Sequence, residues 1–174
     1  MRYRPRVEVF CFRGPRVLAG VADEGYVIFP GGGIDPSENS VEAAKREFAE
    51  EASRRLTNCT VAHPPTTQPW PDGYKNDGMK WKKGYDGGHT VWMTGSCSDE
   101  LPSLKHPDYE PSVTWRPIDD VVAMVKKAKG WEKDNAVRLA ILQAHQTMRL
   151  DRAPAKAAGV FPRLVATGSG GLQG

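Results

Sequence analysis

Three glutamates, Glu47, Glu50 and Glu51, recur at helical spacing in one acidic segment of the chain. At about 100° per residue, their carboxylates share an arc of about 100° on one face of a helix. Like charges at this spacing repel and cost stability in water. A divalent cation would offset that cost, because Mg²⁺ and Mn²⁺ prefer oxygen ligands. Taken alone, however, the acids favour an ordinary solvated face paired with Arg46 and Arg54.

The hydrophobic pattern predicts the elements that must position these acids. Asn39 or Ser40 can cap the acidic helix, whose apolar stripe is expected to pack on a sheet. The remaining pattern predicts strands at 7–12, 16–22, 26–29, 89–97 and 113–116, and further helices at 118–129 and 132–150.

Composition places the chain among soluble globular proteins. It has 174 residues, of which 39% are hydrophobic and 26% charged, with a net charge of +3, which is too small to select a partner. Residues 1–5 are too short and polar for a signal peptide, and no apolar run could span a bilayer, so we expect a cytoplasmic protein without a membrane partner. Cys11, Cys59 and Cys97 are widely spaced and are expected to be reduced thiols.

The residues around the acids fall into a longer register. Their order is Gly32, five residues to Glu38, seven more to Arg46-Glu47, then Phe48, Ala49 and Glu50-Glu51. This register resembles the Nudix box, Gly-x5-Glu-x7-Arg-Glu-hydrophobe-x-Glu-Glu-x-Gly-hydrophobe. The preceding Phe-Pro-Gly-Gly-Gly and the later Val-Thr-Trp-Arg-Pro-Ile-Asp-Asp-Val also resemble Nudix domains. We therefore expect a Nudix hydrolase domain at 1–150 and, at 151–174, a flexible tail or expression remnant rich in small residues.

Two positions depart from the box. Ser53 stands where the family has glycine, and Arg54 stands where it has an apolar residue. Because that glycine lets the chain leave the helix, we expect the helix to continue toward Leu56, with Asn58 as a left-handed cap. Leu56 is expected to supply the missing hydrophobic contact. The departures leave the metal-facing acids untouched.

The resemblance implies an α/β fold, namely an α/β/α sandwich with a mixed β-sheet. It also implies hydrolysis of a nucleoside diphosphate linked to another moiety, with Mg²⁺ or Mn²⁺ as cofactor. Carried over position by position, Glu47, Glu50 and Glu51 match the metal-binding acids of the family. The backbone carbonyl of Gly31 matches a further metal ligand beside them.

Other positions of the box match supporting roles. Arg46 matches the arginine that orients the neighbouring glutamate, and Glu38 matches the first glutamate of the box, whose role is more structural. Gly32 and Gly33, with Gly31, leave room for backbone near the substrate phosphates. A P-loop is not expected, because no Gly-Lys-Ser/Thr follows the glycines.

A general base is expected to assist the water that attacks phosphorus in such a reaction. Glu47 is the candidate within the box. Glu110, five residues before Trp115, is the first candidate outside it, ahead of Asp108 and Glu100. The competing interpretation of Glu110 is an ordinary exposed loop acid.

The Pro- and Gly-rich stretch 59–88 is predicted to be a long loop, a kind of segment that is more often functional than idle. Within it, Gln68-Pro69-Trp70-Pro71 resembles part of the signature of NADH diphosphatases, although the remainder of that signature is missing. Alternatively, an aromatic side chain stacks on a base while a lysine meets a phosphate, or the aromatics pack the loop onto the domain. The candidates are Trp70, Tyr74, Trp81 and Tyr85, with Lys83 as the lysine.

Two classes of function stay open on this sequence. The first is hydrolysis of a small-molecule nucleotide substrate, with capped or triphosphorylated RNA as a further candidate and a homodimer as a candidate assembly. The second is a catalytically silent Nudix-like module that binds a nucleotide or an RNA end. Such a module would be marked by loss of a metal-binding acid, and none is lost.

Overall fold

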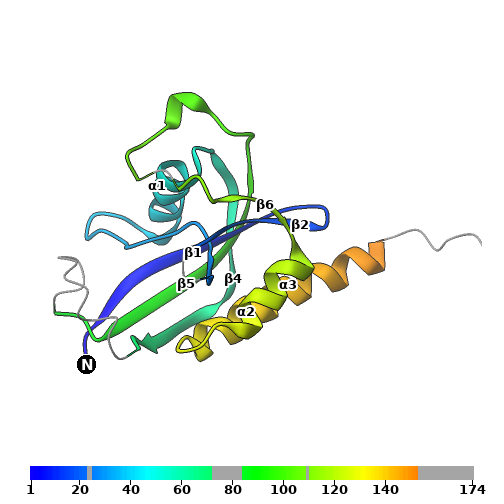
Figure 1. Ribbon diagram of the computed structural model, residues 1–174. Helices are drawn as coiled ribbons and strands as arrows, with labels where there is room; N and C mark the ends of the chain where they lie inside the picture. Colours follow the sequence, from blue (N-terminus) through cyan, green and yellow to red (C-terminus); the bar gives the residue numbers. More distant parts are fainter. Residues whose placement is uncertain (23–24, 72–83, 109, 153–174) are drawn as a thin grey trace, which may run out of the picture.

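The computed structural model describes residues 1–22, 25–71, 84–108 and 110–152 (Figure 1). Within these residues, six strands form one sheet, and three α-helices and a short 3-10 helix (Pro102–Leu104) accompany it. The strands are β1 Tyr3–Arg13, β2 Arg16–Val21, β3 Val27–Ile28, β4 Leu56–Pro69, β5 Gly87–Cys97 and β6 Thr114–Pro117. The helices are α1 Ser40–Ala52, α2 Ile118–Lys127 and α3 Glu132–Arg152.

The sheet is mixed. Its strand order is β3-β2-β1-β5-β4, with β6 also paired to β2. β1 and β5 are parallel, whereas the other pairs are antiparallel. Helix α1 covers one face of the sheet, and α2 and α3 cover the other (Figure 1). The predicted α/β/α sandwich with a mixed sheet is therefore confirmed.

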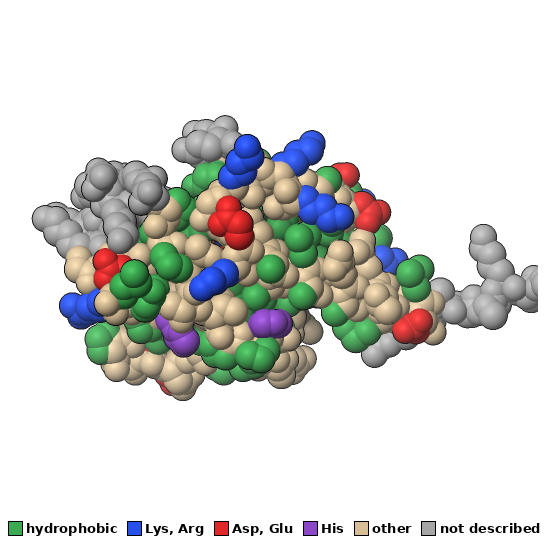
Figure 2. Space-filling model, turned by 90° about the horizontal axis from the view of Figure 1, so that it is seen from below, with side chains coloured by type: hydrophobic (Ala, Val, Ile, Leu, Met, Phe, Trp, Pro, Cys, Tyr) green, Lys and Arg blue, Asp and Glu red, His purple; other side chains and the backbone are tan. Residues whose placement is uncertain are grey.

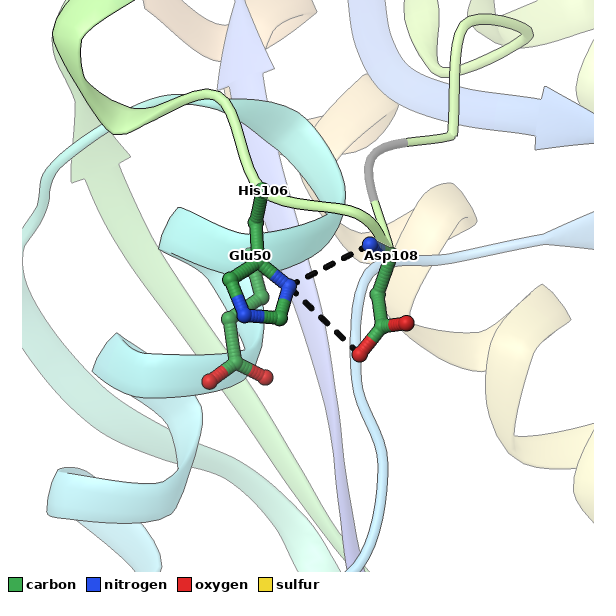
Figure 3. Close-up of side chains that lie close together, drawn as sticks. All are labelled: Glu50, His106 and Asp108. Atoms are coloured by element: carbon green, nitrogen blue, oxygen red, sulfur yellow. Dashed lines mark hydrogen bonds and ion pairs between the residues drawn. The ribbon is translucent and has the colours of Figure 1, made fainter.

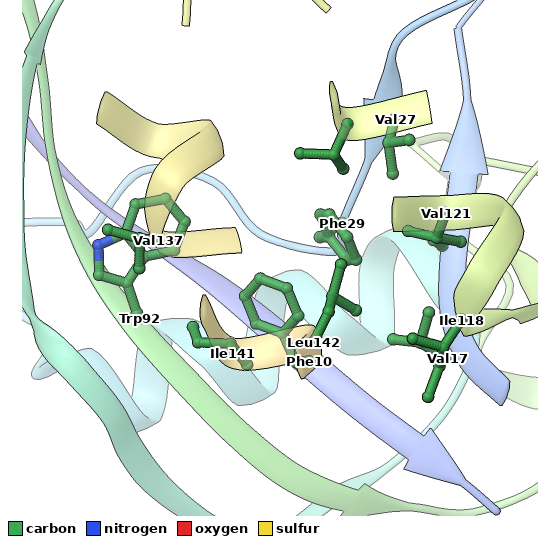
Figure 4. Packing of buried hydrophobic residues seen from close by; sticks show 12 residues of the cluster. Phe10, Val17, Val27, Phe29, Trp92, Ile118, Val121, Val137, Ile141 and Leu142 are labelled. Atoms are coloured by element: carbon green, nitrogen blue, oxygen red, sulfur yellow. The ribbon is translucent and has the colours of Figure 1, made fainter. Parts of the chain in front are cut away.

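Strand β1 separates two hydrophobic cores, because successive side chains of a strand point to opposite faces. Val7, Val9 and Cys11 are buried on the α1 side, in one cluster with Phe48. Phe10 lies on the other face, in the cluster beneath α2 and α3 that Figure 4 shows. Its neighbours there include Phe29, whose ring centroid is 4.4 Å from that of Phe10, and Trp92, Val121, Ile141 and Leu142.

Helix α1 begins with a capping box. The Asn39 side-chain oxygen accepts hydrogen bonds from the backbone N–H groups of Val41 and Glu42, at 2.9 and 3.0 Å. The Glu42 carboxylate accepts a hydrogen bond from the Asn39 N–H at 2.9 Å. Of the two predicted caps, Asn39 is therefore the N-cap of the helix. The negative charge of Glu42, in the first turn, is stabilised by the positive end of the helix dipole.

The prediction for the end of this helix was wrong. Helix α1 ends at Ala52, and Ser53 adopts the left-handed conformation, with φ 50° and ψ 38°. Ser53 therefore takes the conformation that suits the glycine of the box. Asn58 is also left-handed, with φ 50°, but it lies within β4 at a register shift and caps nothing. Leu56 packs in the cluster beneath α1, as predicted.

The prediction of a long loop at 59–88 was wrong, because much of this stretch belongs to strand β4. β4 pairs antiparallel with β5 over much of its length. β4 lies at the edge of the sheet. Pro64 and Pro65 have no backbone N–H, and an edge strand tolerates this because one of its sides has no neighbouring strand to pair with. Three register shifts break its alternation of side chains. Edge prolines and bulges therefore hid this strand from a pattern of period two.

The prediction at 118–129 is also corrected, because α2 ends at Lys127 and Gly130 lies in the connection to α3 with φ 84°. Helix α3 agrees closely with the predicted 132–150.

Helix α3 is fastened to the sheet by buried polar groups at its start. Thr66 on β4 accepts a hydrogen bond from the Trp92 indole N–H at 2.9 Å, and its hydroxyl points to Asp134 at 3.5 Å. Asp134 is only 3% exposed. Burial, followed by the charge of Glu8, raises the pKa of Asp134 to about 6.

The surface carries charges of both signs, scattered on the face in Figure 2 among separate hydrophobic side chains. In the part of the chain that the structure describes, none of the helices is long and apolar enough to cross a membrane. The three cysteines are free thiols, and Cys11 is buried.

Replacing Ser53 with glycine is expected to stabilise the protein by about 1 kcal/mol, because glycine adopts the left-handed conformation without the steric cost of a Cβ. The buried Ser53 hydroxyl, which has no hydrogen-bond partner among the described residues, is removed at the same time. Urea unfolding measures the change. Ser53→Ala is the matched control, since it removes the hydroxyl but keeps the strained conformation; an alanine variant as stable as the glycine variant would contradict the conformational explanation.

Replacing Asp134 with asparagine is expected to stabilise the protein at pH 7.5 and to have little effect at pH 4. The folded state raises the pKa of Asp134 above its unfolded value, so wild-type stability falls as pH rises between about 4 and 6. A pKa shift of this size corresponds to about 2–3 kcal/mol of unfolding free energy. Because asparagine stays neutral, the variant is expected to regain that free energy above about pH 6. Melting temperatures across pH test this, with the exposed Asp120→Asn as control. An equal gain at both pH values would refute the titration of Asp134.

Candidate active site

The glycine turn runs beside β1 and carries its backbone close to the acidic helix. The carbonyl oxygens of Pro30 and Gly32 accept hydrogen bonds from Val9 and Val7, each at 2.9 Å. The Gly31 N–H donates to a carboxylate oxygen of Glu51 at 2.9 Å. The turn is therefore held on one side by the sheet and on the other by α1.

Two of these glycines are required by close approach. A Cβ at Gly31 would collide with the carbonyl oxygen of Val7 on β1. A Cβ at Gly32 would collide with the carboxylate of Glu47. A side chain at position 31 would therefore push the turn away from β1, and one at position 32 would displace the Glu47 carboxylate, so the glycines keep the turn close to both.

The Arg46 guanidinium joins the parts of the box. Its Nε and Nη2 donate to the two carboxylate oxygens of Glu38 at 2.6 and 2.9 Å. Nη2 also donates to the Gly33 carbonyl at 2.9 Å. Nη1 donates to Glu47 at 2.9 Å and to Glu50 at 3.2 Å. One side chain therefore orients two of the predicted metal ligands and connects them to the glycine turn.

The protein shifts the pKa values of the site's carboxylates in different directions. The hydrogen bond from Arg46 lowers the pKa of Glu38 to about 2. Burial raises the pKa of Glu51 to about 8, against the opposing hydrogen bond from Gly31. Burial also raises the pKa of Glu47, although its hydrogen bond with Arg46 acts in the opposite direction. Glu47 and Glu51 are therefore acids whose negative charges are poorly compensated within the protein.

The chemistry of the expected metal donors suits a divalent cation, although of the three carboxylates only those of Glu47 and Glu51 line the same pocket. Glu47, Glu50 and Glu51 project from a single helix, and Glu51 is hydrogen-bonded to the backbone of Gly31. All of the proposed donors are oxygens, which suits Mg²⁺ and Mn²⁺. A cation beside the half-buried carboxylates would offset the cost of keeping Glu47 and Glu51 charged.

Two of these acids border a pocket of about 640 Å³. Glu47, Glu51 and the three glycines form one part of its lining. Arg4 and Arg6, two residues apart on β1, also line it. An apolar part is formed by Val27, Phe29, Trp70, Val125, Ala128 and Trp131. The pocket therefore combines acids, guanidinium groups and aromatic rings.

A buried ion pair lies in the pocket wall. Arg138 on α3 donates through Nε and Nη2 to both carboxylate oxygens of Glu8 on β1, at 2.7 and 2.6 Å. Its Nη1 donates to the Asn135 side-chain oxygen at 3.0 Å. This arrangement fastens α3 to the central strand of the sheet.

Glu50 does not line the pocket and instead faces the connection between β5 and β6 (Figure 3). Ligand atoms of Glu50, His106 and Asp108 all lie within 4.8 Å of one another. The His106 Nδ1 accepts a hydrogen bond from the Asp108 N–H at 3.2 Å and lies 3.5 Å from its carboxylate. Asp108 also lines the pocket, so this connection brings one loop acid to the site.

The other predicted loop acids are placed differently. The Glu110 backbone N–H donates to the Glu51 carbonyl at 2.9 Å, but its carboxylate accepts a hydrogen bond from Ser112 at 3.0 Å. Glu100 is an exposed residue 3.9 Å from Arg54. Neither acid lines the pocket, and Asp108, ranked behind Glu110 from the sequence, does.

The predicted aromatic candidates separate into three groups. Trp70 is 4% exposed and lines the pocket. Tyr85 lies under the guanidinium of Arg2, 4.9 Å from its ring centroid, and is not part of the lining. Tyr74, Trp81 and Lys83 lie outside the described residues.

The structure adds pocket residues that the sequence interpretation missed. Three of these residues lie two positions apart on β1: Arg4, Arg6 and Glu8. Because residues two apart in a strand share a face, this spacing indicated that one face of the strand carries charges. Trp131 and Arg138 had no such signal, because their position depends on how the α2–α3 connection folds back over the sheet.

Comparisons with known proteins agree with this architecture. The family model for the NUDIX domain matches residues 2–139. A NUDIX hydrolase from Nitrosomonas europaea aligns with a TM-score of 0.61 and 12% identity, covering 85% of this chain and 91% of its own. A NUDIX family hydrolase from Clostridium perfringens aligns with a TM-score of 0.54 and 15% identity, covering 83% and 99%.

A structure described as an ADP compounds hydrolase aligns with a TM-score of 0.52 and 17% identity, covering 86% of this chain and 75% of its own. At these identities the likeness shows the fold. No curated protein sequence matches the chain significantly. Because the family model covers most of the chain, and Glu47 and Glu51 of the box lie with the glycine turn at one pocket, the chain belongs to the Nudix family.

Proposed function

We propose that this protein is a Mg²⁺-dependent pyrophosphohydrolase that cleaves a nucleoside diphosphate linked to another moiety. One observation carries the proposal: the same pocket is lined by Glu47 and Glu51, by Arg4 and Arg6, and by aromatic side chains. Acids for a metal, cations for phosphates and rings for a base are the groups that such a substrate needs.

Glu47, Glu50, Glu51 and the carbonyl oxygen of Gly31 would hold the cation. Bound there, Mg²⁺ supplies charge neutralisation on the phosphate oxygens and activates water for attack at phosphorus. The chain supplies the orientation, because Arg46 holds Glu47 and Glu50 through hydrogen bonds of 2.9 and 3.2 Å.

Arg4 and Arg6 are proposed to contact the phosphate groups of the substrate. Burial, followed by the charge of Arg6, lowers the pKa of Arg4. Two guanidinium groups that repel each other on a pocket wall favour an anion beside them. Arg4 also lies against Gly33, where a Cβ would collide with its guanidinium, so this cation is close to the glycine turn.

The proton acceptor is proposed to be Asp108, with Glu110 and Glu47 as alternatives. Asp108 lines the pocket and lies beside Glu50, whereas the Glu110 carboxylate is engaged by Ser112. Glu47 is within the box but accepts a hydrogen bond from Arg46, which favours a ligand role.

The similar structure described as an ADP compounds hydrolase supports a substrate that contains a nucleoside diphosphate. Nucleotide sugars, dinucleotides and nucleoside triphosphates share the required bond, and capped or triphosphorylated RNA is a further candidate. Residues 1–150 are proposed as the catalytic domain of a cytoplasmic enzyme. The expected tail at 151–174 lies, from residue 153 onward, outside the described residues. The silent binding module is the alternative, and retention of all three box acids argues against it.

Replacing Glu50 with glutamine is expected to reduce kcat at least about 100-fold with the fold intact, because metal charge stabilisation is worth several kcal/mol. Product analysis with Mg²⁺ is the assay, on a panel of NADH, ADP-ribose, nucleotide sugars, dinucleoside polyphosphates and normal or oxidised nucleoside triphosphates. The exposed Glu100→Gln is the matched control. If the Glu50 variant cleaves at the wild-type rate at saturating Mg²⁺, Glu50 is not a metal ligand. If the wild-type protein cleaves none of the panel, the catalytically silent binding module is favoured.

Replacing Asp108 with asparagine is expected to lower kcat by about 10²–10⁴-fold, the usual contribution of a general base. Glu110→Gln is expected to change kcat much less, since its carboxylate caps a turn at Ser112. The two variants are compared by the pH dependence of kcat. If Glu110→Gln removes the lower limb of the profile and Asp108→Asn keeps it, the assignments are reversed.

A further inference from the structure

The three cysteines of the chain lie on three neighbouring strands of the sheet. Cys11 is on β1, Cys97 on β5 and Cys59 on β4, which are adjacent in the strand order. All three belong to the hydrophobic cluster beneath α1. Cys11 is 1% exposed, whereas Cys59 and Cys97 are half-buried. The proposed hydrolysis uses none of these thiols.

Two of the cysteines form a contact pair. Gly95 lies opposite Cys11 in the parallel register, so Cys97 is the next residue of β5 on the same face. A hydrogen bond from the Cys11 thiol to the Cys97 sulfur lowers the pKa of Cys97. Cys59 stands apart, because its thiol donates to the thioether of Met93 at 3.9 Å, a group that cannot form a disulfide.

Arginine side chains add positive charge beside this pair. Arg54, which departs from the box, is only 8% exposed. Its Nη1 donates to the Ser98 carbonyl at 3.1 Å, its Nη2 is 3.9 Å from the exposed Glu100, and its Nε has no hydrogen-bond partner among the described residues. Besides the hydrogen bond from the neighbouring thiol, the charges of Arg54 and Arg13 lower the pKa of Cys97. A buried cation with so little compensation favours a thiolate next to it.

The end of β5 extends beyond its pairing with β1. The register between these strands stops at Cys11 and Gly95, and Cys97 lies two residues further on. Diagonal neighbours of this kind typically have Cα atoms about 7–8 Å apart, whereas most disulfides need about 4.4–6.8 Å. A disulfide between Cys11 and Cys97 would therefore pull the end of β5 toward β1. Such a strained disulfide is easily reduced, so its formation is reversible.

The segment that follows β5 connects this strand end to the active site. The Leu101 N–H donates to the Ser53 carbonyl at 2.7 Å, and the Glu110 N–H donates to the Glu51 carbonyl at 2.9 Å. Asp108, which lines the pocket, lies between these two contacts in the chain. A displaced end of β5 would therefore shift Asp108 relative to the acids of α1.

We propose that Cys97 and Cys11 form a hydroperoxide-sensitive thiol pair, whose reversible disulfide displaces the end of β5 and slows the proposed hydrolysis. The Cys97 thiolate attacks one oxygen of the hydroperoxide and breaks the O–O bond, giving a sulfenic acid. The other oxygen leaves with the proton that the thiol released, as water or an alcohol. The Cys11 thiol then attacks the sulfenic sulfur, forming the S–S bond, and the hydroxyl leaves with the Cys11 proton as water. Excess thiol reduces the bond again.

Mass spectrometry of the full chain tests the pair. The protein is treated with hydrogen peroxide, quenched with catalase, unfolded and alkylated. Wild type and the matched control Cys59→Ser are expected to lose two hydrogen atoms and to yield a peptide that joins Cys11 to Cys97. Cys97→Ser is expected to form no disulfide. Cys11→Val, which fills the buried position, is expected to stop at a sulfenic acid that dimedone traps.

Two outcomes of this experiment would overturn the thiol pair. One is a wild-type protein that keeps all three thiols under peroxide that oxidises free glutathione. The other is a disulfide that uses Cys59 or joins two molecules. Circular dichroism checks that each variant folds.

Arg54→Leu, which restores the apolar residue of the box, tests whether the cation activates Cys97. Alkylation of Cys97 by iodoacetamide is expected to slow at least about threefold, because the thiolate is the reacting form. Arg54→Lys keeps the charge and is expected to restore most of the rate, and the exposed Arg55→Leu is the control. A Leu variant that reacts as fast as wild type would refute the activation.

Turnover of a cleaved substrate tests the link to the active site. Disulfide-linked wild type is expected to lose most of its kcat and to regain it with dithiothreitol, while Cys97→Ser keeps its kcat in peroxide. An unchanged kcat in the disulfide-linked protein would overturn the link. Because the thiol measurements need no turnover, a chain that forms the disulfide but cleaves nothing refutes only the proposed hydrolysis.

Discussion

The hydrogen bonds of Arg46 are the interaction on which the site depends. The guanidinium holds Glu38 with two bonds, reaches the Gly33 carbonyl, and orients Glu47 and Glu50. It thereby joins the helix, the segment before it and the glycine turn in one rigid unit. Neutral side chains could not do this, because planar multi-donor recognition of several carboxylates is a property of arginine.

Strand β1 divides the molecule by the alternation of its side chains. One face buries Val7 and Val9 against α1, which gives the acidic helix a fixed platform. The other face carries Arg4, Arg6 and Glu8 into the pocket and Phe10 into the second core. Both cores therefore brace the strand that also holds the glycine turn. The charged side chains of β1 can line a pocket because the hydrophobic clusters, rather than these charges, stabilise the sheet.

Local sequence predicted elements well where their signals were local. The cap and apolar stripe of α1, and strands β1, β2 and β5, follow from short-range spacing. β4 was missed because edge prolines and bulges disturb its alternation. The end of α1 was misjudged because Ser53 adopts the left-handed conformation that a non-glycine residue disfavours, while Leu56 beyond it already packs in the core as part of β4.

The sequence by itself determined the family, the acidic face of α1 and the need for glycine beside it, because these depend on residue types at fixed spacings. Only the tertiary structure decided which residues meet those acids. Asp108 enters the pocket and the Glu110 carboxylate does not, although the two are two positions apart. Trp131 reaches the pocket through a turn anchored at Gln68. Such contacts join segments far apart in the chain, and their geometry depends on loop paths and packing that no local pattern encodes.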